Sequence, residues 1–459
     1  MFALNWRRVI PPPRSEAVRE EMTYGGKRQP AGTSQGRPRI GLVVPALEHG
    51  GGVPSVAEFV CDTIERSKAF DLKIVSLAAS YRDALSVSLT RPASWLNGVG
   101  TSESTWHGRR FIRIGALGPE FEFRRYQPRV ALTRLLSDCA FVQVVCGSPA
   151  FACAVCGIGK PVAVHCATRA VVERRHRHAE ARGPTHAWRR WMTRITDRMD
   201  RKALRSVDAI QVMNAWMFNY ARNLNAGRPS IVRLVPPGVD SLRFKPAARR
   251  DIQSNPFVLA VGRFNDPRKN VTMLLKAFAA LPSAVRSDSR LVLAGSAGPS
   301  PDFWARVEKL GLDHSVAFVN SPTVDELIAL YQTATVLASS SDEEGFGMVI
   351  VEAMACGIPI VSTRSGGPDY TIRDGFDGYL TELGNVGELT DRLTRLLSNE
   401  PLNRSMGEAA RKTVLERFDS RVAGKALLET YDALLAVARR PMGYQSRRRD
   451  SQGSVAEYE

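Results

Sequence analysis

Two stretches of the sequence share one pattern: an apolar strand, a glycine-containing loop and then a helix. The first stretch runs from a strand at Arg39–Pro45 into a loop that holds Gly50–Gly52. The second runs from a strand at Pro256–Val261, through Gly262–Asn270, into a helix at Val271–Leu281. Strands and helices alternate after each opening, which is typical of parallel sheets. The sequence therefore predicts an α/β protein with two doubly wound, Rossmann-like domains.

The other expected strands follow from short apolar runs bounded by turn residues. Residues 80–108 carry no such pattern and are interpreted as a loop or a lid. The expected strands are Leu72–Leu77, Arg110–Ile114, Phe141–Val145, Pro161–His165, Asp208–Met213, Ile231–Val235, Arg290–Gly295, Val316–Val319, Thr335–Ala338 and Ile358–Ser362.

The domain boundaries follow from turn residues and polar runs. A rigid turn at Pro236–Asp240 and the polar run Arg249–Asn255 separate the two halves. Both ends of the chain are polar and lack a sustained apolar pattern, which predicts disorder. We expect a basic tail at 1–37, a first domain at 38–247, a second at 248–419, a helix at 420–438 that packs back on the first domain, and a tail at 439–459.

Charge and composition limit the class of protein. The net charge of +17 favours anionic partners. No apolar run is long enough to span a membrane, and the N-terminus lacks the apolar stretch of a signal peptide, so we expect a cytoplasmic protein. The seven cysteines form no disulfide framework. Cys153 and Cys156 have no second ligand pair at zinc-site spacing, so we expect buried thiols and no metal.

Much of the positive charge lies in residues 169–206, which hold twelve Arg or Lys and four Asp or Glu. Within residues 186–205, apolar side chains recur at helical spacing and arginines fill the other faces. Two interpretations stay open: a surface helix whose apolar stripe packs on the domain, or an interfacial helix that rests on anionic lipid. No nucleic-acid motif accompanies the charge, so we expect no nucleic-acid partner. The apolar positions are Trp188, Trp191, Met192, Ile195 and Met199.

The segment Ser339–Leu380 carries the strongest candidate site. Glu344 and Glu352 flank a loop that enters a helix, and eight helical residues would place them on one side, about 12 Å apart. That separation suits the two ends of an elongated ligand rather than one acid–base pair. Glycines let the backbone approach the ligand, and helix N–H groups attract phosphate. The residues between the glutamates that we expect to contact the ligand are Gly345, Phe346, Gly347, Met348 and Val349.

Other candidate residues lie where strands end. Arg263 and Lys269 flank a strand-to-helix loop, where two cations beside free N–H groups suit a pyrophosphate. His165 stands at the end of its predicted strand, where open α/β sheets collect ligand-binding side chains. Glycines in the same loops allow close approach of ligand oxygens; they are Gly51, Gly52, Gly262 and Gly295.

With these residues collected, the chain resembles the retaining glycosyltransferases of family four, which have the GT-B fold. The resemblance covers about residues 39–438 and is most specific in the second half. The motifs that carry it are VPPGVD with Phe244, LAVGRF followed by RKN, LVLAGS, SSSDEEGFGMVIVEAMACGIPIVST, and SGGPDY followed by DGFDG. The chain departs from the usual pattern at Asn214, where serine is common, and at Asp369, where glutamate is common.

The resemblance implies a sugar-nucleotide donor, UDP- or GDP-linked, held by the second domain and an acceptor held mainly by the first. It implies that Glu352 receives the ribose hydroxyls and Glu344 the hydroxyls of the transferred sugar. Arg263 and Lys269 would bind the diphosphate and stabilise the leaving group without a metal ion or cofactor. Gly51 and Gly52 would lie under the diphosphate, and His165 near the acceptor and the reacting sugar. Retaining members are thought to react on one face of the sugar.

The expected product is an α-linked glycolipid, polysaccharide or small glycoside, made in the cytoplasm or at the inner face of a membrane. Two alternatives stay open. The first is a phosphorylase or synthase of the same fold, with Arg169, Arg174 and Arg175 available for a phosphate group. The second is a catalytically inactive binding protein held at a membrane by its basic helix. The acceptor is not indicated by any motif.

Overall fold

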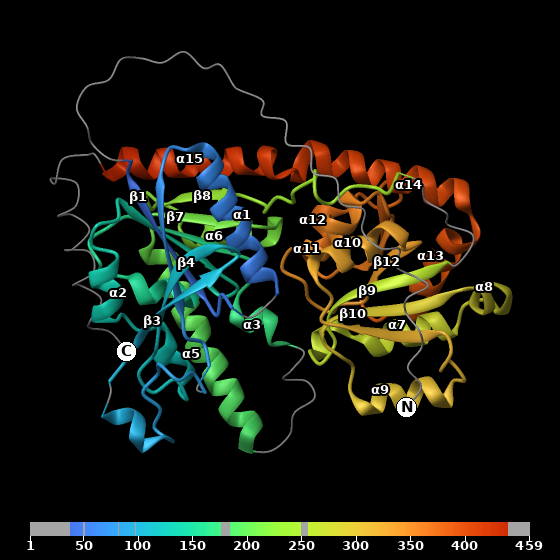
Figure 1. Ribbon diagram of the computed structural model, residues 1–459, viewed down its shortest axis with the longest axis horizontal. Coiled ribbons are helices and arrows are strands. Elements are labelled where there is room, and N and C mark those ends of the chain that lie inside the picture. The colour runs from blue at the N-terminus through green and yellow to red at the C-terminus, as the bar shows by residue number, and fades with distance from the viewer. Residues whose placement is uncertain are drawn as a thin grey trace, which may run out of the picture.

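The computed structural model describes residues 37–48, 51–80, 82–96, 98–175, 184–248 and 256–438. The chain forms two α/β domains that lie side by side (Figure 1). The tails predicted at 1–37 and 439–459 lie outside these ranges, except for Arg37, as do His49 and Gly50 of the first glycine loop.

The first domain is built on an eight-stranded sheet in the order β3-β4-β2-β1-β5-β6-β7-β8. All neighbours are parallel except β3 and β4, which are antiparallel. The strands are β1 (Arg39–Pro45), β2 (Asp71–Leu77), β3 (Thr101–Trp106), β4 (Arg109–Ile114), β5 (Phe141–Cys146), β6 (Val162–Cys166), β7 (Ala209–Val212) and β8 (Ile231–Leu234).

The second domain is built on a six-stranded parallel sheet in the order β11-β10-β9-β12-β13-β14. Its strands are β9 (Phe257–Arg263), β10 (Arg290–Ala297), β11 (Val316–Asn320), β12 (Val336–Ser339), β13 (Ile360–Thr363) and β14 (Gly378–Thr381). The prediction of two doubly wound domains is confirmed, and every strand named from the sequence is present with ends shifted by at most two residues.

Helices cover both sheets. Those of the first domain are α1 (Gly52–Ser67), α2 (Val130–Leu135), α3 (Ala170–Glu173), α5 (Pro184–Ser206) and α6 (Ala215–Leu224), with short turns η2 (Pro92–Trp95), η3 (Glu122–Tyr126) and η4 (Pro149–Val155). Those that follow are η5 (Pro267–Lys269), α7 (Val271–Ala279), α8 (Ser283–Asp288), α9 (Pro301–Lys309), α10 (Val324–Thr333), α11 (Met348–Ala355), α12 (Pro368–Thr371), α13 (Val386–Ser398), α14 (Glu400–Thr413), η6 (Val414–Phe418) and α15 (Ser420–Ala438).

Two strands were not predicted, β3 and β14. β3 is an edge strand whose residues alternate between exposed and half-buried, so it lacks an apolar run. It joins β4 through His107 and Gly108, both with positive φ, which is the geometry of a two-residue hairpin turn. Residues 80–108, interpreted as a loop or lid, therefore contain η2 and an edge strand. Asp83 anchors this segment to β4 through an ion pair with Arg113 at 2.7 Å.

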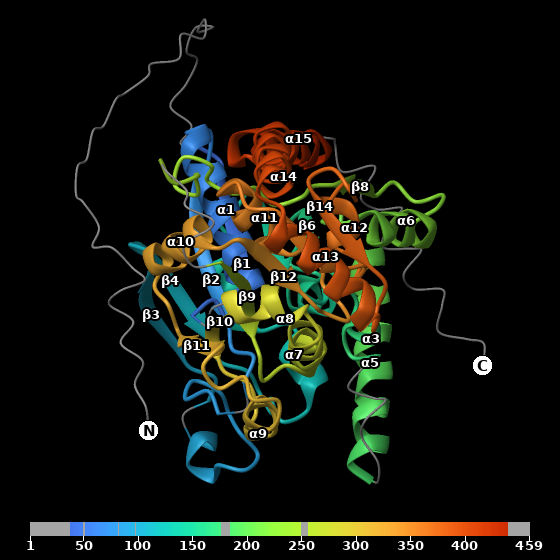
Figure 2. The same cartoon turned by 90° about the vertical axis from the view of Figure 1, so that its right-hand side faces the viewer.

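Helix α15 returns from the second domain to the first. It runs with α14 along one end of both sheets (Figures 1 and 2). Tyr431 of α15 is buried against Phe70 and Phe141 of the first domain. Where the chain turns into this helix, Ser420 donates its N–H to the Val239 carbonyl at 2.9 Å. Helix 420–438 thus packs on the first domain, although the chain reaches it from the second.

Helix α5 is present as expected, but its buried face is not the predicted apolar stripe. Trp188 and Trp191 are each 48% exposed, and of the five apolar positions only Met192 is buried. The face turned to the domain combines small and polar residues with Met192 and Leu204, and it packs closely on η4 and α3. This buried face includes Thr193, Thr196, Asp200, Ala203 and Leu204.

Asp200 is the central contact of that face. Its carboxylate accepts hydrogen bonds from the Ser148 hydroxyl at 2.5 Å and from the N–H groups of Ala150 and Ala170 at 2.8 Å each. One buried acid therefore joins η4 and α3 to α5.

Within the described ranges, no helix combines the length and the apolar character that crossing a membrane requires.

Candidate functional site

The candidate residues gather where strands end at their carboxyl side and the two domains meet. β9 ends in the loop that holds Lys269, and β12 ends just before Glu344. β6 of the first domain ends beside the same loop: a Cβ on Gly345 would lie 2.7 Å from the Ala167 side chain. Carboxyl ends of parallel strands are where α/β folds bind ligands.

Lys269 and Glu344 form the centre of the site. Lys269 Nζ donates to Glu344 Oε2 at 2.6 Å, and both side chains are about one fifth exposed. Burial opposes ionisation of Glu344, but the Lys269 ammonium and its hydrogen bond outweigh it and lower the pKa of this carboxyl. The Glu344 carboxylate is therefore ionised at neutral pH, and the pair is accessible to a ligand.

The loop that carries Lys269 is fixed by the segment before Glu344. Ser340 donates to the carbonyls of Lys269 and Asn270, at 3.0 Å each. Asn270 donates to Asp342 at 2.9 Å and also caps α7 by accepting from the N–H of Met273. These contacts hold the ammonium in place before any ligand arrives, which is how a charged site avoids reorganisation.

Arg268, next to Lys269, has a structural position that the sequence did not indicate. Its guanidinium contacts Asp266 at 2.8 Å and Glu343 at 2.6 Å, and it is largely buried. It also lies 3.7 Å from Glu173 of the first domain. Arg268 therefore balances buried carboxylates and links the two domains, whereas Lys269 faces the accessible part of the site.

Arg263, at the end of β9, is exposed, and its guanidinium has no hydrogen bond or ion pair with the residues that the structure describes. The glycines predicted beside it are required by close approach. A Cβ on Gly295 would lie 1.9 Å from the Gly262 carbonyl oxygen, and a Cβ on Gly262 would lie 3.2 Å from Lys269 Cε. Gly262 and Gly295 thus allow β9, β10 and the Lys269 stem to pack together.

Glu344 does not lie on a helix, which corrects the expected spacing of the two glutamates. α11 begins only at Met348, because Gly347 has a φ of 88° and interrupts the helical backbone. Glu344 is instead held by a glycine turn: its N–H donates to Ser365 at 2.9 Å, and its carbonyl accepts from Gly367 at 2.7 Å. Only Glu352 lies on α11.

Of the residues between the two glutamates, some pack in the core and others offer backbone N–H groups at the start of α11. Phe346 is buried and packs edge-on against Phe418 at 5.8 Å, so its side chain is part of the core. Gly367 must be a glycine, because its Cβ would lie 2.6 Å from the Phe346 Cα. Met348 and Val349 are half-buried and open α11, where the first N–H groups have no intrahelical partner.

Glu352 is positioned by Tyr331, a residue that the sequence did not single out. The buried Tyr331 hydroxyl donates to Glu352 Oε2 at 2.8 Å. Burial raises the pKa of Glu352 to about 7, and the hydrogen bond from Tyr331 partly offsets this effect. The two glutamates therefore differ in charge state near neutral pH, since the pKa of Glu344 is lowered. A tyrosine at the end of an amphipathic helix carries no sequence signal for such a role.

Asn214 joins the two domains beside Glu344. Its side-chain amide donates to the Ala167 carbonyl at 2.9 Å and to the Gly345 carbonyl at 2.6 Å. Its carbonyl oxygen caps α6 by accepting from the N–H of Met217. The unusual asparagine at this position therefore makes a bridge that the shorter serine could not reach. Asp369, the other departure, accepts from the N–H of Gly366 at 2.8 Å.

His165 lies inside β6 and is fully buried. Its Nε2 contacts the Val235 carbonyl oxygen at 2.8 Å, and its Nδ1 is buried without a partner among the described residues. Burial lowers the pKa of His165 to about 4, so the imidazole is neutral at neutral pH and Nε2 is the donor. A contact with a sugar stays a prediction, since the side chain is fully buried in this structure.

The N-terminus of α1 is open. Gly51, with a φ of 130°, and Gly52 have no heavy atom within 4 Å of an added Cβ. Their backbone can therefore be approached closely, as the prediction of a diphosphate contact requires.

The three arginines considered for a phosphate group differ: Arg169 pairs with Asp197 and Arg174 with Glu122, whereas Arg175 is exposed.

Solved structures with a similar fold identify the fold of this chain. The fold matches that of sucrose-phosphate synthase from Thermosynechococcus elongatus, with a TM-score of 0.65, 19% identity and coverage of 87% of this chain and 100% of that one. HepE from Anabaena, solved with UDP and glucose, matches with a TM-score of 0.62, 17% identity and coverage of 86% and 100%. The chain thus has the GT-B fold.

Sequence comparison identifies the second domain more closely. Residues 244–413 match the family of glycosyl transferases group 1, and we assign the second domain to this family. D-inositol 3-phosphate glycosyltransferase of Mycobacterium tuberculosis is 33% identical over 246 residues, which is 50% of this chain and 48% of that protein. N-acetyl-alpha-D-glucosaminyl L-malate synthase of Bacillus anthracis is 37% identical over 153 residues, 33% of this chain and 39% of that protein. These alignments span about half or less of each relative.

Proposed function

We propose that the protein is a retaining glycosyltransferase that moves a sugar from a nucleoside-diphosphate sugar to an acceptor with an α-linkage. The observation that carries the proposal is the fixed Lys269 ammonium, 2.6 Å from Glu344, with Arg263 at the end of β9 exposed and without an acidic partner among the described residues. Two cations beside a carboxylate suit a diphosphate joined to a sugar. A UDP-linked donor is favoured over a GDP-linked one, since HepE of the same fold was solved with UDP.

The proposed roles follow the ligand from one end to the other. Glu352 accepts hydrogen bonds from the ribose hydroxyls, and Glu344 from the hydroxyls of the transferred sugar. Arg263 and Lys269 contact the diphosphate, together with N–H groups at the start of α11 and at Gly51–Gly52. Each partner is a hydrogen-bonding group or a cation of the protein, so the proposal includes no metal ion and no cofactor.

The reaction proposed for this site breaks the bond between the anomeric carbon and the leaving phosphate oxygen. The acceptor oxygen bonds to the same face of that carbon, and its proton passes to the departing phosphate. Negative charge develops on the diphosphate, where fixed cations stabilise the transition state most. His165 is proposed to contact the sugar through its Nδ1, as a neutral hydrogen-bond acceptor, because its Nε2–H is donated to the Val235 carbonyl.

A thermal-shift panel of nucleotides and sugar nucleotides tests the proposal, because a ligand that binds the folded state raises the melting temperature. We expect one diphosphate sugar to raise it and to be hydrolysed or transferred by the protein. A panel without any such ligand would contradict the proposal. Phosphate-dependent breakdown of a disaccharide would instead support the phosphorylase alternative, which the carboxylate partners of Arg169 and Arg174 disfavour.

We further propose that one end of the first domain contacts an anionic membrane. The first turns of α5 project from that end, as does η2 (Figures 1 and 2). Trp188 and Trp191 pack together there with ring centroids 5.1 Å apart, half-exposed, and Arg189 and Arg190 beside them are exposed. Aromatic rings next to arginines are typical of a membrane interface. Further exposed apolar side chains in and near η2 and after β4 are Leu89, Trp95, Leu96 and Leu117.

Sedimentation with vesicles of phosphatidylglycerol at low salt tests this contact, because low salt strengthens attraction between exposed charges. We expect the protein to sediment with the vesicles and the double variant Trp188→Ala/Trp191→Ala to stay in solution. Phe376→Ala, which removes an exposed aromatic ring of the second domain, is the matched control. Sedimentation of the double variant equal to that of the control would exclude a role for the tryptophans.

A further inference from the structure

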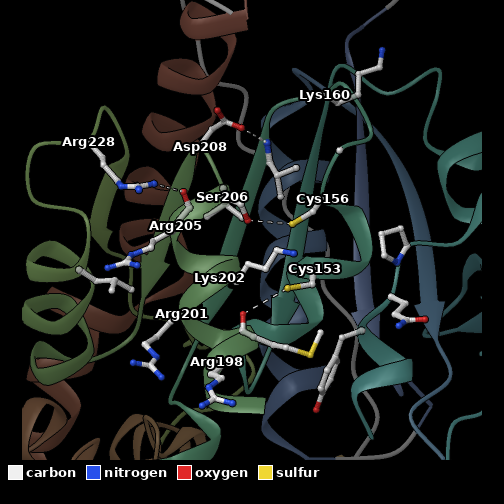
Figure 3. Close-up of a pocket in the computed structure, with 18 of the residues that line it drawn as sticks. Cys153, Cys156, Lys160, Arg198, Arg201, Lys202, Arg205, Ser206, Asp208 and Arg228 are labelled. Carbon is white, nitrogen blue, oxygen red and sulfur yellow. Dashed lines mark hydrogen bonds between the residues drawn. The ribbon is translucent and has the colours of Figure 1, made fainter. Parts of the chain in front are cut away.

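A broad cavity of about 1430 Å³ lies in the first domain, apart from the proposed donor site (Figure 3). It is lined by residues between Tyr126 and Arg228 only, so the second domain does not contribute. Of its lining residues, Lys160 lies two residues before β6 and Asp208 directly before β7. The cavity is therefore at the amino ends of these strands, whereas the donor site is at the carboxyl ends of the strands.

Cations dominate the lining of this cavity. Arg198, Arg201, Lys202 and Arg205 come from α5, and Lys160 and Arg228 from loops. The one acid in the lining is Asp208, whose Oδ2 accepts from the N–H of Val162 at 3.0 Å. Among the described residues, an acidic partner is present only for Arg201, which lies 3.6 Å from Asp197. The cavity therefore has a large excess of positive charge.

The spacing of the four α5 cations makes their arrangement unfavourable without a ligand. Arg198 and Lys202 are four residues apart, as are Arg201 and Arg205, so like charges are neighbours on one helical face. All four are exposed. The negative end of the helix favours a cation at Arg205 in the last turn, but this effect does not reach Arg198 two turns earlier. An anion in the cavity would remove the repulsion.

The size and walls of the cavity limit the ligand. Positions 198 to 205 span about 10 Å along the helix, which exceeds one phosphate group. Tyr220, Met199 and Leu224 add an apolar wall, and Gly157 and Gly159 have no atom within 4 Å of an added Cβ. A ligand with several linked phosphate groups could contact the cations along the helix.

We propose that this cavity binds a soluble anion with two or more linked phosphate groups. Its ligand class is that of an inorganic oligophosphate or a nucleoside triphosphate, and the site is separate from the proposed donor site. Because its cations lie outside that site, binding in the cavity does not depend on whether the protein transfers sugar.

Cys156 gives a reporter inside the cavity. It is the only one of the seven cysteines that is not buried. Its thiol lies 3.2 Å from the Ser206 hydroxyl, and in Figure 3 the Lys202 side chain extends toward it and Cys153. The neighbouring Cys153 thiol, the Ser206 hydroxyl and the nearby Lys202 lower the pKa of Cys156, which favours reaction with an alkylating reagent.

The test is isothermal titration with tripolyphosphate, combined with iodoacetamide labelling of Cys156. To remove the donor site, Lys269→Ala/Arg263→Ala is the starting protein. We expect it to bind tripolyphosphate and to be protected from labelling at Cys156. Adding Lys202→Gln/Arg205→Gln should weaken binding at least tenfold and abolish protection. Adding Arg189→Gln/Arg190→Gln, which removes the same charge from the same helix outside the cavity, should change binding less than twofold.

Three results would overturn the proposal. Equal weakening by the two pairs of glutamine substitutions would mean that only net charge matters. Tripolyphosphate that binds without protecting Cys156 would place the anion elsewhere. Protection by phosphatidylglycerol vesicles and not by tripolyphosphate would assign the cavity to a membrane surface. Melting curves of each variant, expected within a few degrees of one another, show whether Lys202→Gln/Arg205→Gln acts through folding instead.

Discussion

Lys269 Nζ and Glu344 Oε2 lie 2.6 Å apart, although 75 residues separate them in the chain. The backbone of each is held by another loop: the Lys269 carbonyl accepts from the Ser340 hydroxyl, and Glu344 bonds to the turn at Ser365–Gly367. A charge fixed in this way can meet a diphosphate and a sugar hydroxyl together. The pair is therefore the first target for mutation.

Lys269→Ala should reduce turnover of the sugar nucleotide by about 100-fold or more, because a fixed cation at the leaving group is worth roughly that much. The measurement is the initial rate of nucleotide release under saturating donor. Lys276→Ala, an exposed lysine on α7, is the control and should retain full activity. Full activity of Lys269→Ala would refute the assignment of the diphosphate site.

Nucleotide affinity should depend on the ionisation of Glu352, whose pKa burial raises to about 7. The ionised carboxylate accepts ribose hydroxyls better, so UDP should bind about tenfold more tightly at pH 8 than at pH 6. Titration calorimetry across this range measures the effect. Glu352→Gln should lose most of the dependence and keep only the part due to the phosphate itself. An unchanged pH profile in Glu352→Gln would show that Glu352 does not contact the ribose.

The raised pKa of Glu352 makes the folded protein less stable as the pH rises, whereas it makes UDP binding tighter. The pKa of Glu352 in the folded protein, about 7, is above its ordinary value of 4.5. Its contribution to stability is complete below pH 4.5 and is lost as the pH rises to 7. Unfolding by denaturant at pH 5 and pH 7.5 should therefore show a smaller loss of stability with rising pH in Glu352→Gln than in the native protein. A loss of equal size in both would contradict the raised pKa.

Tyr331→Phe should act through Glu352. It removes the hydrogen bond at 2.8 Å, which is worth about 0.5–1.5 kcal/mol, so UDP affinity should fall by roughly two- to thirteenfold. Because that bond lowers the pKa of Glu352, the midpoint of the pH profile should also move to higher pH. A variant with a lower melting temperature but an unmoved midpoint would indicate that Tyr331 only fills the core.

Asn214→Ser separates two roles of one residue. Serine also caps helices, so the start of α6 should stay stable. The shorter side chain cannot bridge Ala167 and Gly345, so the domains should open more readily. Small-angle scattering should give a larger radius of gyration with little change in melting temperature. An identical radius would show that the bridge does not hold the domains together.

Gly295→Ala should destabilise the second domain by about 1–3 kcal/mol, the usual cost of overpacking. Its Cβ would lie 1.9 Å from the Gly262 carbonyl oxygen, which is backbone and cannot move aside. Thermal unfolding measures the effect. Gly52→Ala is the matched control, because no atom lies within 4 Å of its Cβ and stability should be unchanged. Equal melting temperatures for the two variants would contradict the packing described between β9 and β10.

Much of the fold was predictable because its strands are short apolar runs between glycines, prolines and polar residues. β3 was missed since an edge strand needs no apolar run: its outward residues face solvent. The buried face of α5 was misassigned for a related reason. Periodicity finds apolar stripes, but η4 and α3 pack so closely on this helix that small residues and the buried Asp200 fit there, and the tryptophans are left half-exposed.

The sequence by itself determined the two sheets and marked Arg263, Lys269, Glu344 and Glu352 as candidate site residues, because these depend on local patterns and spacing. Only the tertiary structure decided what each side chain contacts. It paired Lys269 with Glu344, placed Tyr331 against Glu352, buried His165 and gathered the α5 cations with Lys160 and Arg228 around one cavity. Such contacts join residues far apart in the chain, and they form only when whole strands and helices pack.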